Sequence, residues 1–339
     1  IKSNALLSDN SPVSKINLDN GTFKFGDDVS TNPKYISYDG NNLTLVGGNV
    51  ISLTDTNISV TVGDTTPVSA GGQGADFATL NEALEYMSKF RIIKKADNST
   101  LSGNITIKSG HIINYSINLY NVDLSWVSIT AEDSNVSVNI SEFRFIDISN
   151  SKAPFISGFV FENISTTNFP DGLVMDNSTI MLSYSGFKNF NNNIRAQNNS
   201  FLGGYNLVLS NAKLDALTLN SSNAFLGSVD FSNALNYAIQ AQNSCKVIAT
   251  ESNFDFCDDA IICSGNSTLD ISGSDLQQAT GAIEISELSF LNAKDCLFHS
   301  FVSPNIIVSD GGIINAKNVT GANFNQTTNT ITGNGIIFN

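Results

Sequence analysis

The sequence predicts an all-β protein, a right-handed parallel β-helix with about 22 residues per coil. Short apolar segments recur along the chain at that period. Only 14% of the 339 residues are charged, against roughly 25% in an ordinary globular protein, and Asn, Ser and Gly take their place. Asn and Ser suit turns better than helices. The right-handed form is expected because about 98% of parallel crossovers are right-handed.

Charge and hydropathy exclude several functional classes. A net charge of −14 argues against nucleic-acid binding, which needs Lys and Arg on one face. No apolar run approaches the roughly 20 residues of a membrane helix, so we expect no membrane insertion. The 41% hydrophobic content, with 22 Phe, is enough for a large core. The two His and four Cys lack metal-ligand spacing, so we expect no metal and no cofactor.

The chain begins with a segment that differs from the rest. Residues 1–62 predict a small β-rich module, either antiparallel or an extended neck, that serves for attachment. Its strand-like segments are residues 15–18, 22–25, 35–38, 43–46 and 50–53, separated by turns rich in Asp, Asn and Gly.

Residues 63–99 predict a Gly-rich connector followed by one amphipathic helix. Apolar residues at 77, 80, 84 and 87 lie on one helical face. Thr79 followed by Glu82 forms a capping-box pattern, and Asp76 is a rival N-cap. The first coil of a β-helix exposes apolar side chains and unpaired strand edges, so we expect this helix to cap it.

Residues 100–339 predict the β-helix itself, with three short strands in each coil and room for ten or eleven coils. The first strand of successive coils begins near Leu173, Ile194, Leu217, Ile239, Ile261, Ile283 and Ile306. A second column includes residues 179–182, 246–249, 268–271, 290–293 and 313–316, and a third includes residues 185–187, 229–231, 253–256, 275–276 and 296–298. Coils before Leu173 are less regular. Stacked corners explain the low charge, because like charges at ~4.8 Å repel whereas Asn and Ser can pair.

Two segments resemble a known family. Residues 74–86, which contain Asp76-Phe77-Ala78-Thr79-Leu80, resemble the segment that leads into the right-handed parallel β-helix of bacteriophage tail fibres and tailspikes. Residues 23–27, 35–40 and 43–45 resemble modules of phage tail fibres and tail-tip host-specificity proteins. The resemblance covers roughly residues 15–130 by motif, and the remainder by architecture alone.

The resemblance implies a homotrimeric protein of the phage tail, attached to other tail or baseplate proteins and acting at the bacterial cell surface. Its expected partner is a bacterial surface polysaccharide, bound as a receptor during host adhesion. The first alternative is a depolymerase of capsule or O-antigen polysaccharide on the same fold, a glycosidase or a lyase. A further alternative is a bacterial β-solenoid adhesin. Whether the protein is an enzyme stays open at this point.

Cleavage of a polysaccharide on this fold would use paired carboxylates about 5–9 Å apart. Residues one coil apart are neighbours at ~4.8 Å, so acids one repeat apart in the sequence can pair. The densest acidic cluster is Asp255, Asp258 and Asp259, and Glu284 follows one coil later. These four residues are the candidate catalytic group. A solvated acidic corner is the competing interpretation.

Binding of a polysaccharide would use exposed aromatic and polar side chains. Tyr205 and Tyr237 are expected near corners, and Gln240 and Arg195 at outward positions of the first strand, so these four are the candidate carbohydrate-binding residues. Coils from Leu173 onward keep close to the length of the repeat and leave no long loops. Deep catalytic clefts usually need such loops, so the pattern favours binding over catalysis.

Overall fold

The computed structural model describes residues 14–17, 21–27, 34–39, 42–46, 51–54, 57–92, 102–276, 283–298, 306–320 and 330–338. Within these ranges the protein is nearly all β and forms a right-handed parallel β-solenoid of about nine turns. The chain divides into two compact units, residues 1–106 with 126–128, and residues 107–125 with 129–339. The predicted three-part division at residues 62 and 99 stays a prediction. No helix in the described part of the chain is long and apolar enough to cross a membrane.

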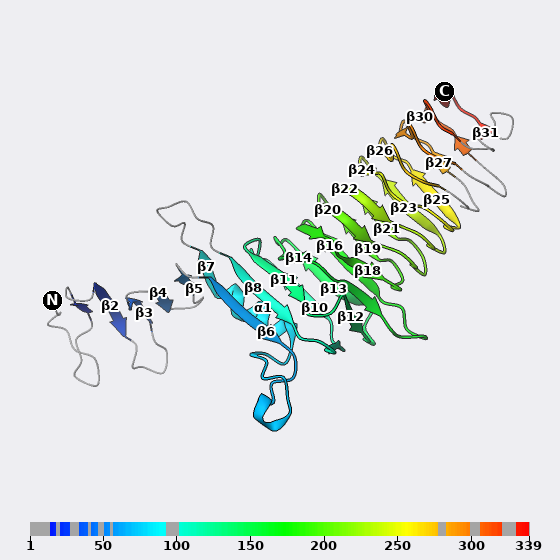
Figure 1. Cartoon of the computed structure of the whole chain (residues 1–339). Coiled ribbons are helices and arrows are strands. Elements are labelled where there is room, and N and C mark those ends of the chain that lie inside the picture. The colour runs from blue at the N-terminus through cyan, green and yellow to red at the C-terminus, as the bar shows by residue number, and fades with distance from the viewer. Residues whose placement is uncertain are drawn as a thin grey trace. The chain divides into compact units, whose positions relative to one another are not determined.

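The first unit contains a six-stranded sheet in the order β1-β2-β3-β4-β5-β7 (Figure 1, dark blue to cyan). Its strands are β1 (Ser14–Asn17), β2 (Thr22–Asp27), β3 (Lys34–Tyr38), β4 (Asn42–Val46), β5 (Ile51–Thr54) and β7 (Phe90–Ile92). Strands β1 to β5 pair antiparallel, and β7 joins β5 in parallel. Of the two arrangements expected from the sequence, the described strands show antiparallel pairing, and the sheet extends past residue 62 through β7.

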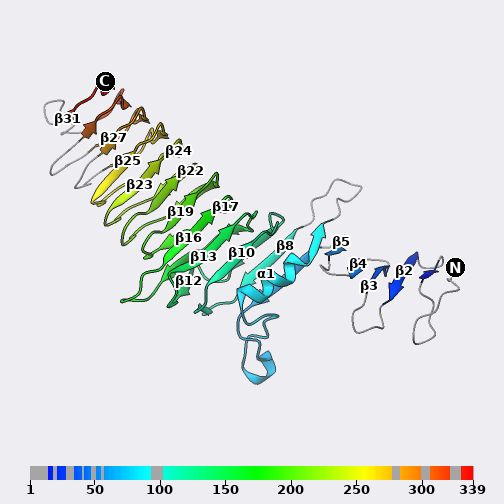
Figure 2. The ribbon, with the colours of Figure 1, turned by 180° about the vertical axis from the view of Figure 1, so that it is seen from behind.

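The predicted helix forms as α1 (Leu80–Ser88) and packs against β6 (Ile58–Val62) and β7. In Figure 2, α1 lies in front of the strands that it packs against. Its capping box is complete, because the Thr79 hydroxyl accepts from the Glu82 amide at 3.2 Å and Glu82 Oε2 accepts from the Thr79 amide at 3.1 Å. The apolar face is buried at Leu80, Ala83, Leu84 and Met87.

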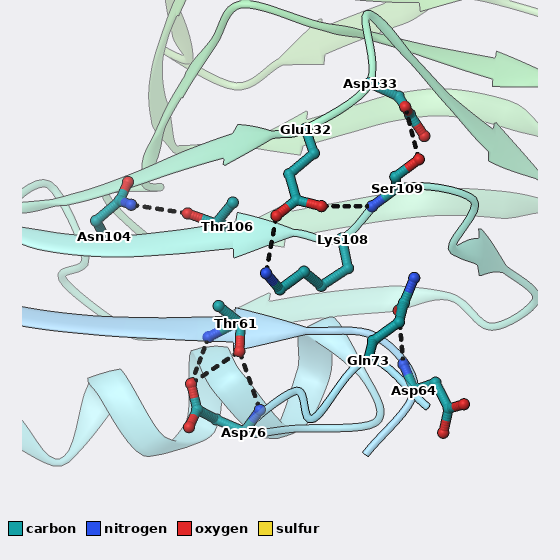
Figure 3. A network of polar contacts seen from close by, with 10 residues as sticks. All are labelled: Thr61, Asp64, Gln73, Asp76, Asn104, Thr106, Lys108, Ser109, Glu132 and Asp133. Carbon is teal, nitrogen blue, oxygen red and sulfur yellow. Dashed lines mark hydrogen bonds and ion pairs between the residues drawn. The ribbon is translucent and has the colours of Figure 1, made fainter. Parts of the chain in front are cut away.

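The connector before α1 folds back on itself through hydrogen bonds (Figure 3). Asp76, the rival N-cap, instead accepts from the Thr61 amide at 2.8 Å and the Thr61 hydroxyl at 2.9 Å. The Asp64 amide donates to Gln73 Oε1 at 3.0 Å, and the short 3₁₀-helix η1 (Val68–Ala70) lies between them. The unit is completed by β8 (Gly103–Ile107), and β11 (Val127–Ala131) crosses its boundary.

The second unit is built from stacked coils that each place strands in up to three sheets. The first sheet has ten parallel strands, stacked along the green-to-red part of Figure 1. They are β10 (Ile117–Tyr120), β13 (Arg144–Ser149), β16 (Asp171–Asp176), β19 (Ile194–Gln197), β21 (Leu217–Asn220), β23 (Tyr237–Gln242), β25 (Asp259–Cys263), β27 (Ile283–Ile285), β29 (Ile306–Val308) and β31 (Thr330–Ile331).

The second sheet follows each first-sheet strand around a corner. Its strands in this unit are β14 (Phe155–Ser157), β17 (Thr179–Ser183), β20 (Phe201–Val208), β22 (Asn223–Asp230), β24 (Lys246–Thr250), β26 (Thr268–Asp270), β28 (Phe290–Asn292), β30 (Ile313–Asn315) and β32 (Ile336–Phe338). A shorter third face pairs β9 (Ile112–Ile113), β12 (Asn135–Val138), β15 (Val160–Asn163) and β18 (Gly186–Lys188). Beyond them it continues as isolated bridges from Asp230 to Thr320.

The strand register confirms the repeat read from the sequence. Leu173 pairs with Ile194, and the same row continues through Leu217, Ile239, Ile261, Ile283 and Ile306. These side chains are buried and form one apolar column. In the second sheet the row from Lys246 to Ile313 also matches the predicted second column.

A buried ladder of serines joins the coils at the corner between the first two sheets. Each backbone amide in the ladder donates to the side chain of its counterpart one coil later, as Ser178 does to Ser200 Oγ at 3.2 Å. The full row is Ser151, Ser178, Ser200, Ser222, Cys245, Ser267 and Ser289. Serine is thus used here to satisfy amides that the solenoid interior hides from water.

Asparagines form a second kind of ladder at exposed corners. The Asn177 amide group donates to Asn150 Oδ1 at 2.8 Å, and Asn243 donates to Asn220 Oδ1 at 3.1 Å. Asn150, Asn177 and Asn243 all have positive φ, a backbone conformation that Asn tolerates better than most residues. The composition therefore follows from the corners that each coil must make.

Coil length divides the second unit into two regions. Ile117 pairs with Ile146, and Ile146 pairs with Leu173. We call the coil from Ile117 to Ile146 and the coil from Ile146 to Leu173 the longer coils. From Leu173 onward the pairs fall closer together in the sequence, and we call these the regular coils. The serine ladder shows the difference, because Ser151 and Ser178 are 27 positions apart, whereas Ser178 and Ser200 are 22 apart. About nine turns form rather than the predicted ten or eleven, and the two longer coils account for part of the difference.

A polar cluster, in the upper part of Figure 3, joins two neighbouring corners near the start of the second unit. Glu132 accepts from Lys108 Nζ at 2.8 Å and from the Ser109 amide at 3.0 Å. The Ser109 hydroxyl donates to Asp133 at 2.9 Å. The hydrogen bonds from Lys108 and from the Ser109 amide hold the pKa of Glu132 below its usual value. Together with the Ser109–Asp133 bond they connect the corners of two neighbouring coils.

Candidate functional site

Several predicted site residues share one outward row of the first sheet. Arg195, Thr218, Gln240, Ile262 and Glu284 occupy successive rungs of this row. Four steps of ~4.8 Å separate its two ends, so Arg195 and Glu284 lie about 19 Å apart along the stack. Both residues face outward, but they cannot contact the same sugar unit.

Arg195 is held by an ion pair. Its Nη1 lies 2.9 Å from Oδ2 of Asp171, whose side chain is only 9% exposed. Asp171 Oδ1 also accepts from the Asn192 side chain at 2.6 Å and from its amide at 3.3 Å. The guanidinium therefore balances a buried carboxylate, and a role for Arg195 in carbohydrate binding stays a prediction.

Tyr237 lies among three of the acids that flank the first sheet. It begins β23 and pairs with Asp259, the first residue of β25. Burial raises the pKa of Tyr237, and the negative charges of Asp259, Glu284 and Asp215 raise it further. Asp215 is buried and accepts from the Tyr237 amide at 3.1 Å. The structure thus places Tyr237 next to Asp259 and Asp215, whereas Glu284 lies two coils on and three residues further along the strand.

Asp255 and Asp258 belong to the corner that precedes β25. Asp258 is exposed and Asp255 is half-buried. Burial raises the pKa of Cys257 to about 12, and Asp230, Asp255 and Asp258 add to that rise. The four predicted acids therefore lie in two neighbouring coils, with Asp255 and Asp258 at the corner before β25, Asp259 at the start of β25 and Glu284 in β27.

Tyr205 lies on the outward face of the second sheet, within the long strand β20. It lies next to the corner between the second sheet and the third face, because β20 pairs with β17 through Tyr205 and with β18 through Val208, and Asn206 between them has a positive φ. The ring is 51% exposed and meets Tyr184 edge-on, with centroids 6.1 Å apart. A Cβ at Gly227, one coil later, would lie 3.0 Å from this ring. Tyr205 therefore shares no site with the first-sheet residues Arg195 and Gln240.

A surface cavity of about 530 Å³ lies at the end of β15, and the sequence did not predict it. Its lining includes Glu162, Asn163, Ser165, Phe169, Asn189 and Lys213. This volume falls within the roughly 300–1,000 Å³ usual for ligand pockets. The wall combines one aromatic ring with amide, hydroxyl, carboxylate and ammonium groups, a set that can bind a polar ligand with an apolar face.

The loop that forms the cavity is held in place by buried hydrogen bonds. Asn163 is 2% exposed and donates to the backbone carbonyls of Asn168 at 3.1 Å and Asn189 at 3.2 Å. Its side-chain oxygen accepts from the Ser165 amide at 3.2 Å. Asn168 in turn donates to the Ile140 carbonyl at 2.6 Å, one coil earlier. The cavity wall is thus ordered before any ligand arrives, which reduces the entropy lost on binding.

The two charged side chains that line the cavity, Glu162 and Lys213, make different contacts. Glu162 accepts from Lys188 Nζ at 3.2 Å and from the Asn189 side chain at 3.1 Å, so its charge is balanced. Lys213 Nζ lies 5.4 Å from the centre of the Phe169 ring. An ammonium over an aromatic face is a cation–π contact, and it positions both groups on the same wall.

One signal in the sequence could have located this cavity. The coil from Ile146 to Leu173 is longer than the regular coil from Leu173 to Ile194, and the surplus lies in residues 164–170 before β16. The sequence prediction described the coils before Leu173 only as less regular and did not identify these extra residues. Loops inserted into a rigid scaffold are where binding sites are usually found.

Comparison with known proteins adds no functional assignment. No family model matches the chain, and no curated protein matches it. Among the described residues, no group of three or more His, Cys, Asp or Glu is arranged to hold a metal ion.

Proposed function

We propose that this protein is a subunit of a phage tail fibre or tailspike that binds a polysaccharide of the bacterial surface. The parallel β-solenoid supports the proposal at the level of fold. The resemblance of residues 74–86 to the segment that leads into tailspike β-helices supports it at the level of sequence. The place of action would be the virion tail at the bacterial cell surface.

The cavity beside Phe169 is the observation that carries the binding function. Sugars present polar hydroxyl edges and a less polar face, and the cavity offers groups for both. Phe169 supplies a ring for stacking, while Glu162, Asn189 and Lys213 supply hydrogen-bond acceptors and donors. The loop of residues 164–170 is held in place by the hydrogen bonds of Asn163. A cavity that is already ordered suits a protein that binds its receptor without rearranging.

A binding experiment with matched aromatic variants tests this function. Purified capsular and O-antigen polysaccharides are immobilised, and binding is measured by biolayer interferometry. Phe169→Ala is expected to lower affinity at least 10-fold. Phe143→Ala is the control, because Phe143 is 94% exposed and does not line the cavity. No binding to any polysaccharide, or equal loss in both variants, would contradict the proposal.

A depolymerase is the second candidate function, and the stacking of β25 on β27 favours it, because this stacking places Asp259 and Glu284 in neighbouring coils. Paired carboxylates could act as general acid and as base or nucleophile. Asp259→Asn and Glu284→Gln should then abolish the release of reducing ends from a bound polysaccharide while leaving binding intact. Unchanged release in both variants would remove these residues from any catalytic role.

We also propose that the protein assembles as a homotrimer attached to tail or baseplate proteins. The family resemblance supports this assembly, and so does an apolar row on the outward face of the second sheet. Met181 is 46% exposed and Phe225 39% exposed, and Gly203 lies between them in the register. Multi-angle light scattering should give three times the chain mass of 36.2 kDa. A stable monomer would contradict it.

A further inference from the structure

The two charged side chains that line the cavity differ in their partners. Glu162 is balanced by Lys188 at 3.2 Å. Lys213 lines the same cavity, and in the described part of the chain no carboxylate forms an ion pair with it. One ammonium group therefore remains available to a ligand.

The charge balance of the chain adds to the significance of this lysine. The chain carries 31 acidic and only 17 basic side chains, and many of the described lysines and arginines form an ion pair with an acid, as at Arg195–Asp171 and Lys108–Glu132. A lysine kept on a cavity wall without such a partner, in a protein of net charge −14, creates local attraction for an anion.

The position of Lys213 also suits a sugar that carries a charge. Its ammonium lies 5.4 Å from the Phe169 ring centre, so a saccharide stacked on the ring would bring its substituents within reach of Nζ. A neutral polysaccharide would gain only hydrogen bonds there, because hydroxyl groups offer no charge to pair with the ammonium. A charge-assisted hydrogen bond to an anionic group is roughly twice as strong as a neutral one.

We infer that the polysaccharide bound in this cavity is acidic and that Lys213 binds its anionic group, a carboxylate or a phosphate. This inference rests on the proposed polysaccharide-binding function and specifies the chemical class of the ligand. Glu162 lines the same cavity, and its pairing with Lys188 at 3.2 Å balances its charge.

The test uses the full chain and an array of purified bacterial polysaccharides of three kinds, neutral, carboxylate-bearing and phosphate-bearing. Each carboxylate-bearing binder is also printed after its carboxyl groups are reduced to alcohols. Lys213→Gln removes the charge, and Lys213→Arg keeps it. Lys246→Gln is the matched control, because Lys246 has the same 5.4 Å contact with Phe225 outside the cavity.

The expected binders are acidic. Carboxyl reduction and Lys213→Gln should each lower affinity about 10- to 100-fold, while Lys213→Arg and Lys246→Gln should change it less than 3-fold. Binding should weaken as salt rises from 50 to 500 mM, because salt screens the ion pair. If phosphate-bearing polysaccharides alone bind, the anion is the phosphate.

Strong binding of a neutral polysaccharide, unaffected by Lys213→Gln, would overturn the inference while leaving the proposed function intact. Absence of binding to every polysaccharide would instead refute the proposed function. Thermal unfolding of each variant shows whether a lost affinity reflects a lost fold, and Lys213→Arg separates charge from side-chain packing at the same position.

Discussion

The longer coils and the regular coils obey one register but differ in what they present to solvent. In both, the first-sheet strands pair residue for residue, and Ile146 continues the same buried column as Leu173 and Ile194. The longer coils add their extra residues outside this column. From Leu173 onward the regular coils repeat this pairing at a nearly constant spacing along the sequence.

The serine ladder explains how the scaffold tolerates the insertion. It begins in a longer coil, where the Ser151 amide donates to Ser178 Oγ at 3.1 Å, and continues into the regular coils without a break. The stacking of one coil on the next is therefore fixed at corners far from residues 164–170 along the turn. A solenoid can thus vary one corner while the others keep the register.

Core packing gives the largest expected difference between the two regions. Phe161 contacts the rings of Phe145, Phe159 and Phe187, with centroids 4.8–5.5 Å away. Phe231 in the regular coils contacts only Phe254 among the described ring pairs, at 5.0 Å. Phe161→Ala should cost about 3–5 kcal/mol of unfolding free energy, and Phe231→Ala should fall at or below the low end of that range. Urea unfolding measures both, and equal costs would contradict the contrast.

Two buried asparagines allow a matched test of the loop. Asn193 is fully buried in the regular coils and, like Asn163, donates to two backbone carbonyls and accepts from one backbone amide. Replacing either by Ala leaves buried polar groups without partners, so both should lose about 2–3 kcal/mol of stability. Only Asn163→Ala should also weaken polysaccharide binding, because only Asn163 holds the cavity loop. Loss of binding in both variants would show that binding depends on overall stability.

Buried thiols give the regular coils an alkaline pH dependence. Burial raises the pKa of Cys257 and Cys263 to about 12, while an unfolded thiol ionises near 8.5. Above pH 8.5 the unfolded state loses protons that the folded state keeps, so stability falls as pH rises. Between pH 8 and 9.5 the loss should be about 1 kcal/mol per thiol. Urea unfolding of Cys263→Ala should show a shallower pH dependence than the parent protein, and an identical dependence would contradict this reasoning.

The cysteine in the serine ladder predicts the smallest effect. The Ser222 amide donates to Cys245 Sγ at 3.5 Å, and sulfur is a weaker acceptor than a hydroxyl oxygen. Cys245→Ser restores the ladder's usual residue and should change stability by less than about 1 kcal/mol, whereas Ser200→Ala should cost about 1–3 kcal/mol. Thermal melts of the two variants measure the contrast. A large loss in Cys245→Ser would mean that sulfur packing outweighs the hydrogen bond.

The repeat and the helix could be predicted from the sequence because both depend on residue spacing. Buried side chains must be apolar in every coil, so the column from Leu173 to Ile306 was visible, and Thr79 with Glu82 marked the helix start. Coil length could have located the loop of the longer coil, but the cavity itself also depends on which backbone carbonyls accept hydrogen bonds from Asn163, and the sequence does not show that. Tyr205 lies beside Asn206, whose positive φ marks the corner between the second sheet and the third face.

Hydrogen–deuterium exchange with bound polysaccharide tests the central claim most directly, because it locates the ligand without altering the protein. We predict that an acidic polysaccharide protects the amides of residues 163–169 and 189, in and beside the loop of the longer coil. The amides around Tyr237 and Glu284 in the regular coils should exchange as in the free protein. Protection confined to those regular coils would contradict the assignment of binding to the cavity.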